Sequence, residues 1–130
     1  MKVSIVIPVY NEFRTFGQVL ERVRRAGLPS GCSKEIIVID DGSTDGTAQM
    51  LGPERHAISH SGKGSAIRAG IELATGDIVL IQDGDLEYDP EDYARILEPI
   101  VTGQADIVYV RAFSANRWRW HCPTASPTAS

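Results

Sequence analysis

The sequence of 130 residues has only two cysteines, Cys32 and Cys122, and no apolar run long enough to cross a bilayer. Two cysteines at this spacing provide neither a metal-binding motif nor a disulfide framework, so a reducing compartment is expected. A membrane-spanning helix needs about 20 apolar residues. The apolar run at the N-terminus is too short for a signal peptide because it stops at Pro8. We therefore expect a cytoplasmic location. If the protein works at the cytoplasmic face of a membrane, something outside this chain must hold it there.

Basic residues are also too few for a general nucleic-acid binder. The formal net charge is −4, whereas such proteins are normally basic. Seven acidic side chains lie between Asp77 and Asp92, a stretch that contains no Lys or Arg. After Ile107 the sign reverses, with three Arg and no acidic residue. The acidic stretch and the basic tail are therefore the features that most need an explanation.

Short apolar runs alternate with amphipathic segments along most of the chain. Runs rich in β-branched residues, without polar alternation, indicate parallel strands buried on both faces. The pattern predicts an α/β fold, a mostly parallel sheet of about five strands with helices on both faces. Ligands of such sheets bind at the carboxyl ends of the strands. The predicted strands are residues 3–9, 35–39, 56–59, 78–81 and 105–110.

The segments between the predicted strands carry helix start and stop signals. Ser43 or Thr44 is expected to cap a short helix that ends at Leu51. Asp89 followed by a proline is a typical helix start. Gly76 suits the position after the C-terminus of a helix at about 64–75. The apolar face of that helix is predicted to be Ala66, Ile67, Gly70, Ile71 and Ala74.

The C-terminal residues do not continue the strand and helix pattern. Residues 123–130 repeat Pro-Thr-Ala-Ser twice and contain no core-forming side chain. We expect a domain at 1–109 and an atypical, disordered tail at 110–130. The abrupt change in composition suggests that the tail comes from a shifted reading frame or an artificial junction.

The segment Asp83-Gly84-Asp85 follows a predicted buried strand and points to a metal site. Two carboxylates one residue apart repel each other unless a cation or water lies between them. Their hard oxygen atoms suit Mg²⁺ or Mn²⁺, and Glu87 offers a third carboxylate. A solvated acidic loop is the alternative, and it is the more common meaning of this motif taken alone.

Two further loops have chemistry that fits a nucleotide. Asp40 and Asp41 follow a predicted strand, where a carboxylate can accept hydrogen bonds from a base or a ribose; a helix-capping role is the alternative. An EF-hand is excluded because Gly52 stands where a bidentate Glu is required. Lys63, between two glycines at a helix start, can meet an anion, or it can be a solvated loop lysine. The surrounding sequence lacks the full P-loop pattern.

Taken together, these motifs resemble the family 2 glycosyltransferases. The matching segments are Pro-Val-Tyr-Asn-Glu at 8–12, Asp-Asp-Gly-Ser-Thr-Asp at 40–45, Gly-Lys-Gly at 62–64 and Gln-Asp-Gly-Asp at 82–85. They occur in the family's order over residues 2–109. The residues that follow look most like the branch of dolichyl-phosphate mannose synthases and other polyprenyl-phosphate sugar transferases. The resemblance implies a Rossmann-like GT-A fold, of which this chain would be the nucleotide-sugar-binding half.

The resemblance also implies roles for individual residues. It implies a GDP- or UDP-sugar donor, a polyprenyl phosphate acceptor and a Mg²⁺ or Mn²⁺ ion bound by Asp83, Asp85 and Glu87. Transfer would invert the anomeric carbon, and an acceptor that is already anionic needs no strong general base. No catalytic residue is identifiable beyond the metal site. The implied donor-binding residues are Pro8, Tyr10, Asn11, Glu12, Val38, Asp40, Asp41, Lys63, Asp83, Gly84 and Asp85.

Two other functions remain open from the sequence. A nucleotide-binding module without transferase activity would need the first three motifs and no metal chemistry. A nucleotidyltransferase would share the fold, although its Gly-rich pyrophosphate loop is not seen after the first strand. The family usually continues well past residue 109 into an acceptor-binding region, so the chain alone is expected to be inactive.

Overall fold

A four-stranded parallel sheet forms the centre of the computed structural model, which describes residues 1–52, 54–84, 89–113 and 117–121. The strand order is β3-β2-β1-β4, and all three pairings are parallel. This confirms the predicted α/β sheet, with four strands in the described residues instead of about five. The strands are β1 (Lys2–Val9), β2 (Ser33–Asp40), β3 (Arg55–Ala57) and β4 (Ile78–Ile81).

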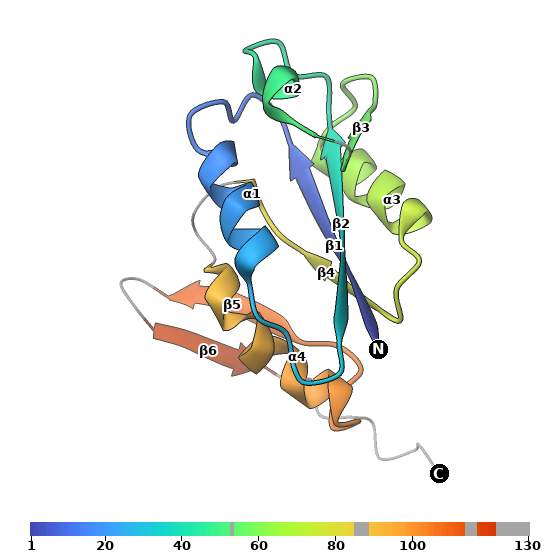
Figure 1. Ribbon diagram of the computed structural model, residues 1–130, viewed down its shortest axis with the longest axis vertical. Coiled ribbons are helices and arrows are strands. Elements are labelled where there is room, and N and C mark those ends of the chain that lie inside the picture. The colour runs from blue at the N-terminus through green and yellow to red at the C-terminus, as the bar shows by residue number, and fades with distance from the viewer. Residues whose placement is uncertain (53, 85–88, 114–116, 122–130) are drawn as a thin grey trace.

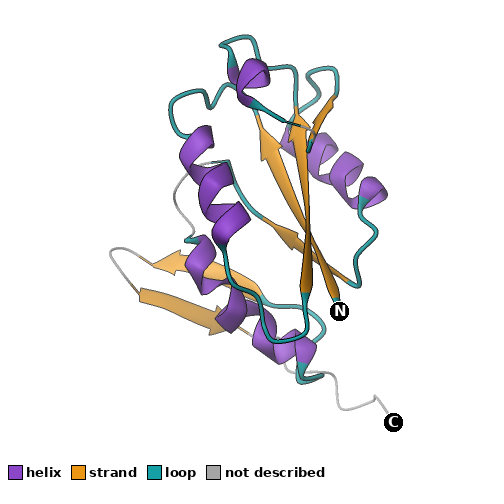
Figure 2. Ribbon diagram, viewed as in Figure 1, coloured by secondary structure: helices purple, strands orange, loops and turns teal. Residues whose placement is uncertain are grey.

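Helices cover both faces of the sheet, as the strand pattern predicted (Figures 1 and 2). The helices α1 and α4 lie against one face and α3 against the other. A single 3₁₀ turn, η1, leads into α4. The bounds are α1 (Phe16–Arg25), α2 (Thr47–Met50), α3 (Lys63–Leu73), η1 (Pro90–Asp92) and α4 (Tyr93–Val101).

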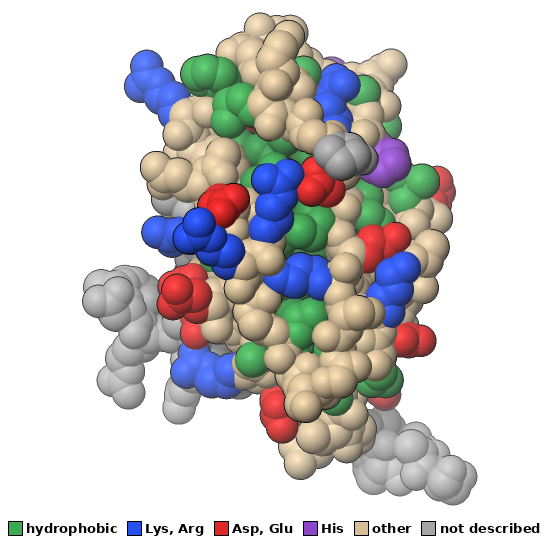
Figure 3. Space-filling model, in the orientation of Figure 1, with side chains coloured by type: hydrophobic (Ala, Val, Ile, Leu, Met, Phe, Trp, Pro, Cys, Tyr) green, Lys and Arg blue, Asp and Glu red, His purple; other side chains and the backbone are tan. Residues whose placement is uncertain are grey.

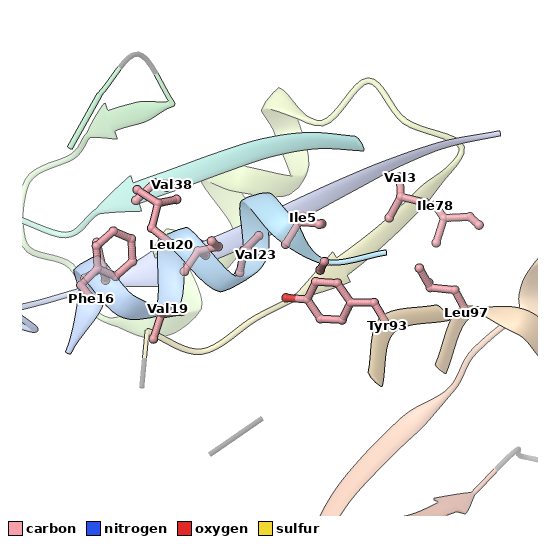
Figure 4. Packing of buried hydrophobic residues seen from close by; sticks show 13 residues of the cluster. Val3, Ile5, Phe16, Val19, Leu20, Val23, Val38, Ile78, Tyr93 and Leu97 are labelled. Carbon is pink, nitrogen blue, oxygen red and sulfur yellow. The ribbon is translucent and has the colours of Figure 1, made fainter. Parts of the chain in front are cut away.

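The larger core lies between the sheet and the pair α1 and α4 (Figure 4). Successive side chains of a strand point to opposite faces, so Val3, Ile5 and Ile7 of β1 enter this core together. Complete burial of one such aliphatic side chain stabilises a fold by about 1.5–3 kcal/mol. The helices contribute Phe16, Val19, Leu20, Val23, Tyr93 and Leu97.

The smaller core under α3 depends on close backbone approach. A Cβ atom added at Gly70 would lie 2.2 Å from Cγ1 of Val6, so only glycine lets α3 sit this near β1. Ala66 and Gly70 are buried, but Ile71 is 49% exposed. The predicted apolar face was therefore wrong at Ile71, because the contact runs along the small residues of the helix.

Gly76 is needed for contact and not as a helix cap. The helix α3 ends at Leu73, and Ala74 is already extended. A Cβ atom at Gly76 would lie 2.6 Å from Oγ of Ser4 and 2.7 Å from the carbonyl oxygen of Lys2. The expected left-handed cap is therefore wrong, and the glycine lets the chain pass beside the start of β1.

A network of polar groups closes the amino end of the sheet. Ser4 Oγ donates to Glu35 Oε2 at 2.6 Å, and the Thr75 amide donates to the same oxygen at 3.1 Å. These hydrogen bonds, with Lys2 nearby at 3.7 Å, hold the pKa of Glu35 below its usual value. The Gly76 amide completes the network by donating to Ser4 Oγ at 2.8 Å.

Lys34 stabilises the C-terminus of α1. Its ammonium group donates to the carbonyl oxygens of Val23, Arg24 and Ala26 at 2.9, 2.9 and 2.6 Å. The last carbonyls of a helix have no partner within the helix and carry partial negative charge, so a lysine satisfies them well. Partial burial lowers the pKa of Lys34.

The helix start at Asp89 is confirmed, whereas the fifth predicted strand is not in the sheet. Asp89 Oδ1 accepts a hydrogen bond from the Glu91 amide at 3.0 Å, and α4 continues through Pro99 to Val101. The expected strand at 105–110 instead begins at 109. There β5 (Tyr109–Phe113) pairs antiparallel with β6 (Arg117–His121). A local hairpin closes a shorter loop than a distant parallel pairing does.

The hairpin occupies part of the segment that we expected to be disordered. The proposed boundary between 109 and 110 falls inside β5 and stays a prediction. On the face shown in Figure 3, basic and acidic side chains lie side by side, in keeping with the ion pairs Arg24–Glu54 at 3.0 Å and Arg25–Glu21 at 2.9 Å. None of the described helices is both long enough and apolar enough to span a membrane.

Candidate functional site

A pocket of about 310 Å³ opens where β1, β2 and β4 end and α3 begins. The ends of β1 and β2 coincide, with Val9 beside Asp40, and β4 ends at Ile81 beside Val6 of β1. The loops that leave the strands therefore meet at one edge, as expected for a parallel sheet. The residues that line the pocket are Pro8, Val9, Tyr10, Glu12, Asp41, His60, Gly62, Lys63, Ala66, Asp83 and Gly84.

Asp41 organises the loop that leads into α3. The residue is 3% exposed. Its Oδ1 accepts a hydrogen bond from the Ser61 amide at 2.8 Å, and its Oδ2 accepts one from the Gly62 amide at 2.9 Å. His60 Nδ1 lies 3.0 Å from Oδ2. Because Asp41 binds two backbone amides of the loop before α3, it fixes this wall of the pocket.

Asp40 and Val38 do not join Asp41 in the lining of the described pocket. Asp40 is buried and accepts hydrogen bonds from the Ser43 amide at 2.9 Å and from Arg55 Nε at 3.2 Å. Asp40 therefore links the end of β2 to β3 and to the loop that follows β2. Val38 is fully buried in the larger core. The expectation that Asp40 and Val38 belong to the donor-binding residues stays a prediction.

Asn11 stabilises a loop beside the pocket. Its backbone is left-handed, at φ 52°, a conformation that Asn adopts more readily than most residues. The backbone amide of Asn11 donates to Ser43 Oγ at 3.0 Å, and the side-chain oxygen Oδ1 accepts from the backbone amide of Thr44 at 2.8 Å. Asn11 therefore holds the loop after β2 against the end of β1. In the described residues it does not line the pocket itself.

These contacts correct the predicted cap of α2. Ser43 and Thr44 bond to Asn11, and the N-cap position of α2 is Gly46, at φ 97°. Asp45 performs the capping instead, because its Oδ1 accepts from the Thr47 amide at 3.0 Å. Hydrogen bonds from the Thr47 hydroxyl and amide lower the pKa of Asp45. The prediction, Ser43 or Thr44, placed the capping side chain two or one residues too early.

Asp83 is the acidic side chain that the strand β4 delivers to the pocket. Its Oδ1 forms an ion pair with Lys63 at the start of α3. Gly84 lies tightly against β1, since a Cβ atom there would be 3.3 Å from the carbonyl oxygen of Pro8. Asp85 and Glu87, which the sequence predicted as metal ligands, lie outside the described residues.

A buried glutamine fixes the backbone of Asp83. Gln82 is 1% exposed, and its Nε2 donates to the Asp83 carbonyl oxygen at 3.1 Å. Its Oε1 accepts from the Tyr93 hydroxyl of α4 at 2.5 Å. Burial raises the pKa of Tyr93, so the phenol keeps its proton and remains a donor. Gln82 therefore links the start of α4 to the backbone of Asp83 through two hydrogen bonds.

The residues at Asp83 fit part of a divalent-metal site. A carboxylate supplies the hard oxygen that Mg²⁺ and Mn²⁺ prefer; in the structure Asp83 forms an ion pair with Lys63. Within the described ranges no group of three or more His, Cys, Asp or Glu side chains could hold a metal ion. Of the three expected metal ligands, Asp83 is the one that lies within the described residues, and its role stays a prediction.

His60 is one of the lining residues that the sequence analysis missed. Its ring stacks on Tyr10, with the centroids 4.2 Å apart and the planes inclined by 22°. Val9, Gly62 and Ala66 also line the pocket without having been predicted. A lone histidine in a loop has no motif of its own. The only signal was its place three residues before Lys63.

The family model described as "Glycosyl transferase family 2" matches residues 4–127. The chain belongs to glycosyl transferase family 2. The match confirms the predicted family and enzyme class, and it extends beyond the residues 2–109 on which the sequence resemblance was based.

Curated relatives carry the name undecaprenyl-phosphate 4-deoxy-4-formamido-L-arabinose transferase. Those of Pectobacterium carotovorum subsp. carotovorum and Pectobacterium atrosepticum are each 40% identical to this chain over 120 residues. The match covers 85% of the chain but 37% of each relative. The chain thus spans little more than a third of the length of these glycosyltransferases.

Solved family structures share the fold. Glucosyl-3-phosphoglycerate synthase from Mycobacterium tuberculosis, in complex with Mn²⁺ and UDP-glucose, superposes with a TM-score of 0.67 at 29% identity, covering 79% of this chain and 40% of that one. A mannosyltransferase from Pyrobaculum calidifontis, in complex with GDP-Man and Mn²⁺, gives 0.57 at 28% identity, covering 69% and 29%. These likenesses confirm the GT-A type of α/β fold.

Proposed function

We propose that this chain is the donor-binding half of a metal-dependent, inverting glycosyltransferase. The pocket at the carboxyl end of the sheet would bind a GDP- or UDP-sugar. The whole protein would transfer the sugar to a polyprenyl phosphate. The observation that carries the proposal is the meeting of Asp83, Lys63 and the start of α3 in one pocket.

The charges in the pocket suit a nucleoside diphosphate accompanied by a cation. Lys63 and the N-terminal end of α3 offer positive charge to phosphate oxygens. Asp83 offers a carboxylate to the cation. In the proposal Pro8, Tyr10 and Glu12 line the nucleotide site, while Asn11 holds the neighbouring loop in place.

Asp83 would hold the Mg²⁺ or Mn²⁺, together with Asp85 and Glu87 from the segment outside the described residues. Such an ion supplies neutralisation of the negative charge that develops on the departing nucleoside diphosphate. Gln82 would keep Asp83 in position, because it binds the backbone of Asp83 and is itself held by Tyr93. The structural relatives crystallised with Mn²⁺ and a sugar nucleotide support this assignment.

The acceptor is proposed from the relatives named as undecaprenyl-phosphate transferases. A phosphate acceptor is anionic before it reacts, so it needs no strong general base. Its direct attack on the anomeric carbon inverts the configuration there. Because a polyprenyl chain dissolves in a bilayer, we place the transfer at the cytoplasmic face of a membrane.

Titration calorimetry of the full 130-residue chain tests the donor half of the proposal. UDP and GDP, with their sugars, are titrated with Mn²⁺ and again with EDTA. We expect one of the two diphosphates to bind with Mn²⁺ and to lose at least about tenfold in affinity with EDTA. Asp83→Asn should lose a similar factor, about 1.4 kcal/mol, because the amide cannot neutralise the ion.

Asp106→Asn is the matched control, because it removes the same charge from an exposed residue after α4, outside the pocket lining. It should bind like the unchanged chain. Binding that EDTA does not weaken would instead support a nucleotide-binding module without metal chemistry. Lack of binding by UDP, GDP and their sugars would overturn the proposal.

A further inference from the structure

His60 is held on three sides at the rim of the pocket. Its ring lies over Tyr10, with the centroids 4.2 Å apart. Its Nδ1 is 3.0 Å from Asp41 Oδ2 and 3.1 Å from the Asp41 carbonyl oxygen. Gly42 makes room for the loop, since a Cβ atom there would be 3.1 Å from the His60 amide nitrogen. The imidazole therefore has a fixed orientation, although its side chain is 57% exposed.

The partners of Nδ1 determine where the ring proton sits. Both oxygens near Nδ1, a carboxylate and a carbonyl, are acceptors, so Nδ1 must be the N–H donor. In neutral histidine the other ring nitrogen is then an acceptor. Asp41 therefore leaves His60 with a hydrogen-bond acceptor at Nε2.

The same contacts occupy the carboxylate of Asp41. It receives the Ser61 amide, the Gly62 amide and the His60 ring, with both oxygens engaged. The sequence analysis expected an aspartate of this loop to accept a hydrogen bond from the base. In the structure His60 is the side chain beside Tyr10 that keeps an acceptor of this kind.

We propose that His60 is a specificity-determining residue that reads the nucleobase of the donor through an acceptor at Nε2. This inference rests on the proposed function, since it concerns the same pocket. Uracil carries an imino N–H at N3 and guanine carries one at N1, whereas cytosine and adenine have bare acceptor nitrogens at the equivalent positions. His60 thus favours uracil and guanine and disfavours cytosine and adenine. Asp41 and Tyr10 are positioning residues for the ring.

The test compares bases that carry this N–H group with bases that lack it, and the N-methyl analogues change that group alone. The full chain is titrated with Mn²⁺ and UDP, CDP or 3-methyl-UDP, and with GDP, ADP or 1-methyl-GDP, at about pH 8, where imidazole is generally neutral. If UDP is preferred, it should bind about tenfold more tightly than 3-methyl-UDP and CDP; if GDP is preferred, it should bind about tenfold more tightly than 1-methyl-GDP and ADP. The reason is that an unmatched hydrogen-bonding group weakens binding. His60→Phe retains an aromatic ring and should reduce that ratio to within about twofold.

His56→Phe is the matched control, because His56 is exposed on β3 outside the pocket lining; it should keep the full ratio. If His60→Phe keeps the full ratio while diphosphates still bind, the inference is wrong and the proposed function stands. If UDP and GDP do not bind the unchanged chain, both fail. A second measurement, ¹⁵N NMR of the histidine rings, covers a variant that does not fold. It should show Nδ1 protonated, and an Nε2 signal that shifts on binding. An Nε2–H tautomer would overturn the inference.

Discussion

The two ends of the parallel sheet both carry carboxylates, but they use them differently. At the amino end, Glu35 is surrounded by Ser4, Thr75 and Lys2, and the hydrogen bonds close on themselves. At the carboxyl end, both carboxylate oxygens of Asp41 also accept hydrogen bonds. Here, however, the surrounding loops enclose a pocket, and Asp83 is part of its lining. One end thus joins chain segments, and the other end lines a pocket with charged groups.

The difference arises from how the segments leave the sheet. At the amino end, Gly76 lets the chain pass against Ser4 with little space between them. At the carboxyl end, residues that follow β1, β2 and β4 line a pocket together with the start of α3. Substitutions at the amino end should therefore change stability alone. Substitutions around Asp83 should change ligand affinity as well.

The largest effect is expected from Gly76→Ala. Its Cβ atom would meet the Lys2 carbonyl oxygen and Ser4 Oγ at less than 3 Å, and overpacking of this kind costs about 3 kcal/mol. Urea unfolding should show the loss, while the folded fraction keeps its affinity for the diphosphate. Gly27→Ala is the control, since nothing lies within 4 Å of that position. Equal stability of the two variants would contradict the close contact.

Tyr93→Phe should have an intermediate effect, and it should lower both the stability of the fold and the affinity for the diphosphate. The substitution leaves the buried Gln82 Oε1 without its donor, which costs about 2 kcal/mol. Because Gln82 also holds the Asp83 backbone, diphosphate affinity should fall a few-fold in the same variant. Denaturant unfolding and calorimetry measure the two losses. A stability loss with unchanged affinity would separate Gln82 from the pocket.

The smallest effect is expected from Glu35→Gln, and it should depend on pH. Hydrogen bonds, first from the Ser4 hydroxyl, hold the pKa of Glu35 below its ordinary value of 4.5. The ionised group therefore stabilises the folded chain above that value, and this contribution is lost as the pH falls through the lowered pKa. At neutral pH the variant should lose about 1 kcal/mol.

The stability difference between Glu35→Gln and the unchanged chain should vanish on acidification, as followed by denaturant unfolding across pH. Diphosphate affinity at neutral pH should stay the same, because Glu35 lies at the end of the sheet opposite the pocket. A difference that persists at low pH would show that the charge of Glu35 is not what stabilises this end.

The sequence predicted the sheet better than it predicted the loops. Runs such as residues 3–9, apolar except for Ser4, indicate a buried parallel strand whatever the details of side-chain packing. Whether Val38 faces a core or a pocket depends on which face each helix covers, and a single strand does not contain that information. Ser43 and Thr44 suited a cap locally, but Asn11, more than 30 residues away, takes their hydrogen bonds.

The site was predictable where chemistry follows a strand directly. Asp41 and Asp83 were expected at the same edge because strand ends of a parallel sheet meet there, whereas Pro8 was implied by the family resemblance; all three line the pocket. His60 was missed because its role depends on a stack with Tyr10 and a bond to Asp41, two contacts from distant parts of the chain. The hairpin of β5 and β6 was missed because an apolar run does not specify its pairing partner.

The comparison of the two sheet ends is tested most directly by NMR of the uniformly ¹⁵N-labelled chain, titrated with UDP or GDP and Mg²⁺. The account predicts that amide shifts gather at residues 9–12, 40–44, 60–64 and 83–84, around the pocket. Amides of residues 33–35 and 74–77, at the amino end, should stay in place. Shifts centred on the amino end, or none anywhere at saturating ligand, would contradict the claim that the carboxyl end of this sheet is the donor site.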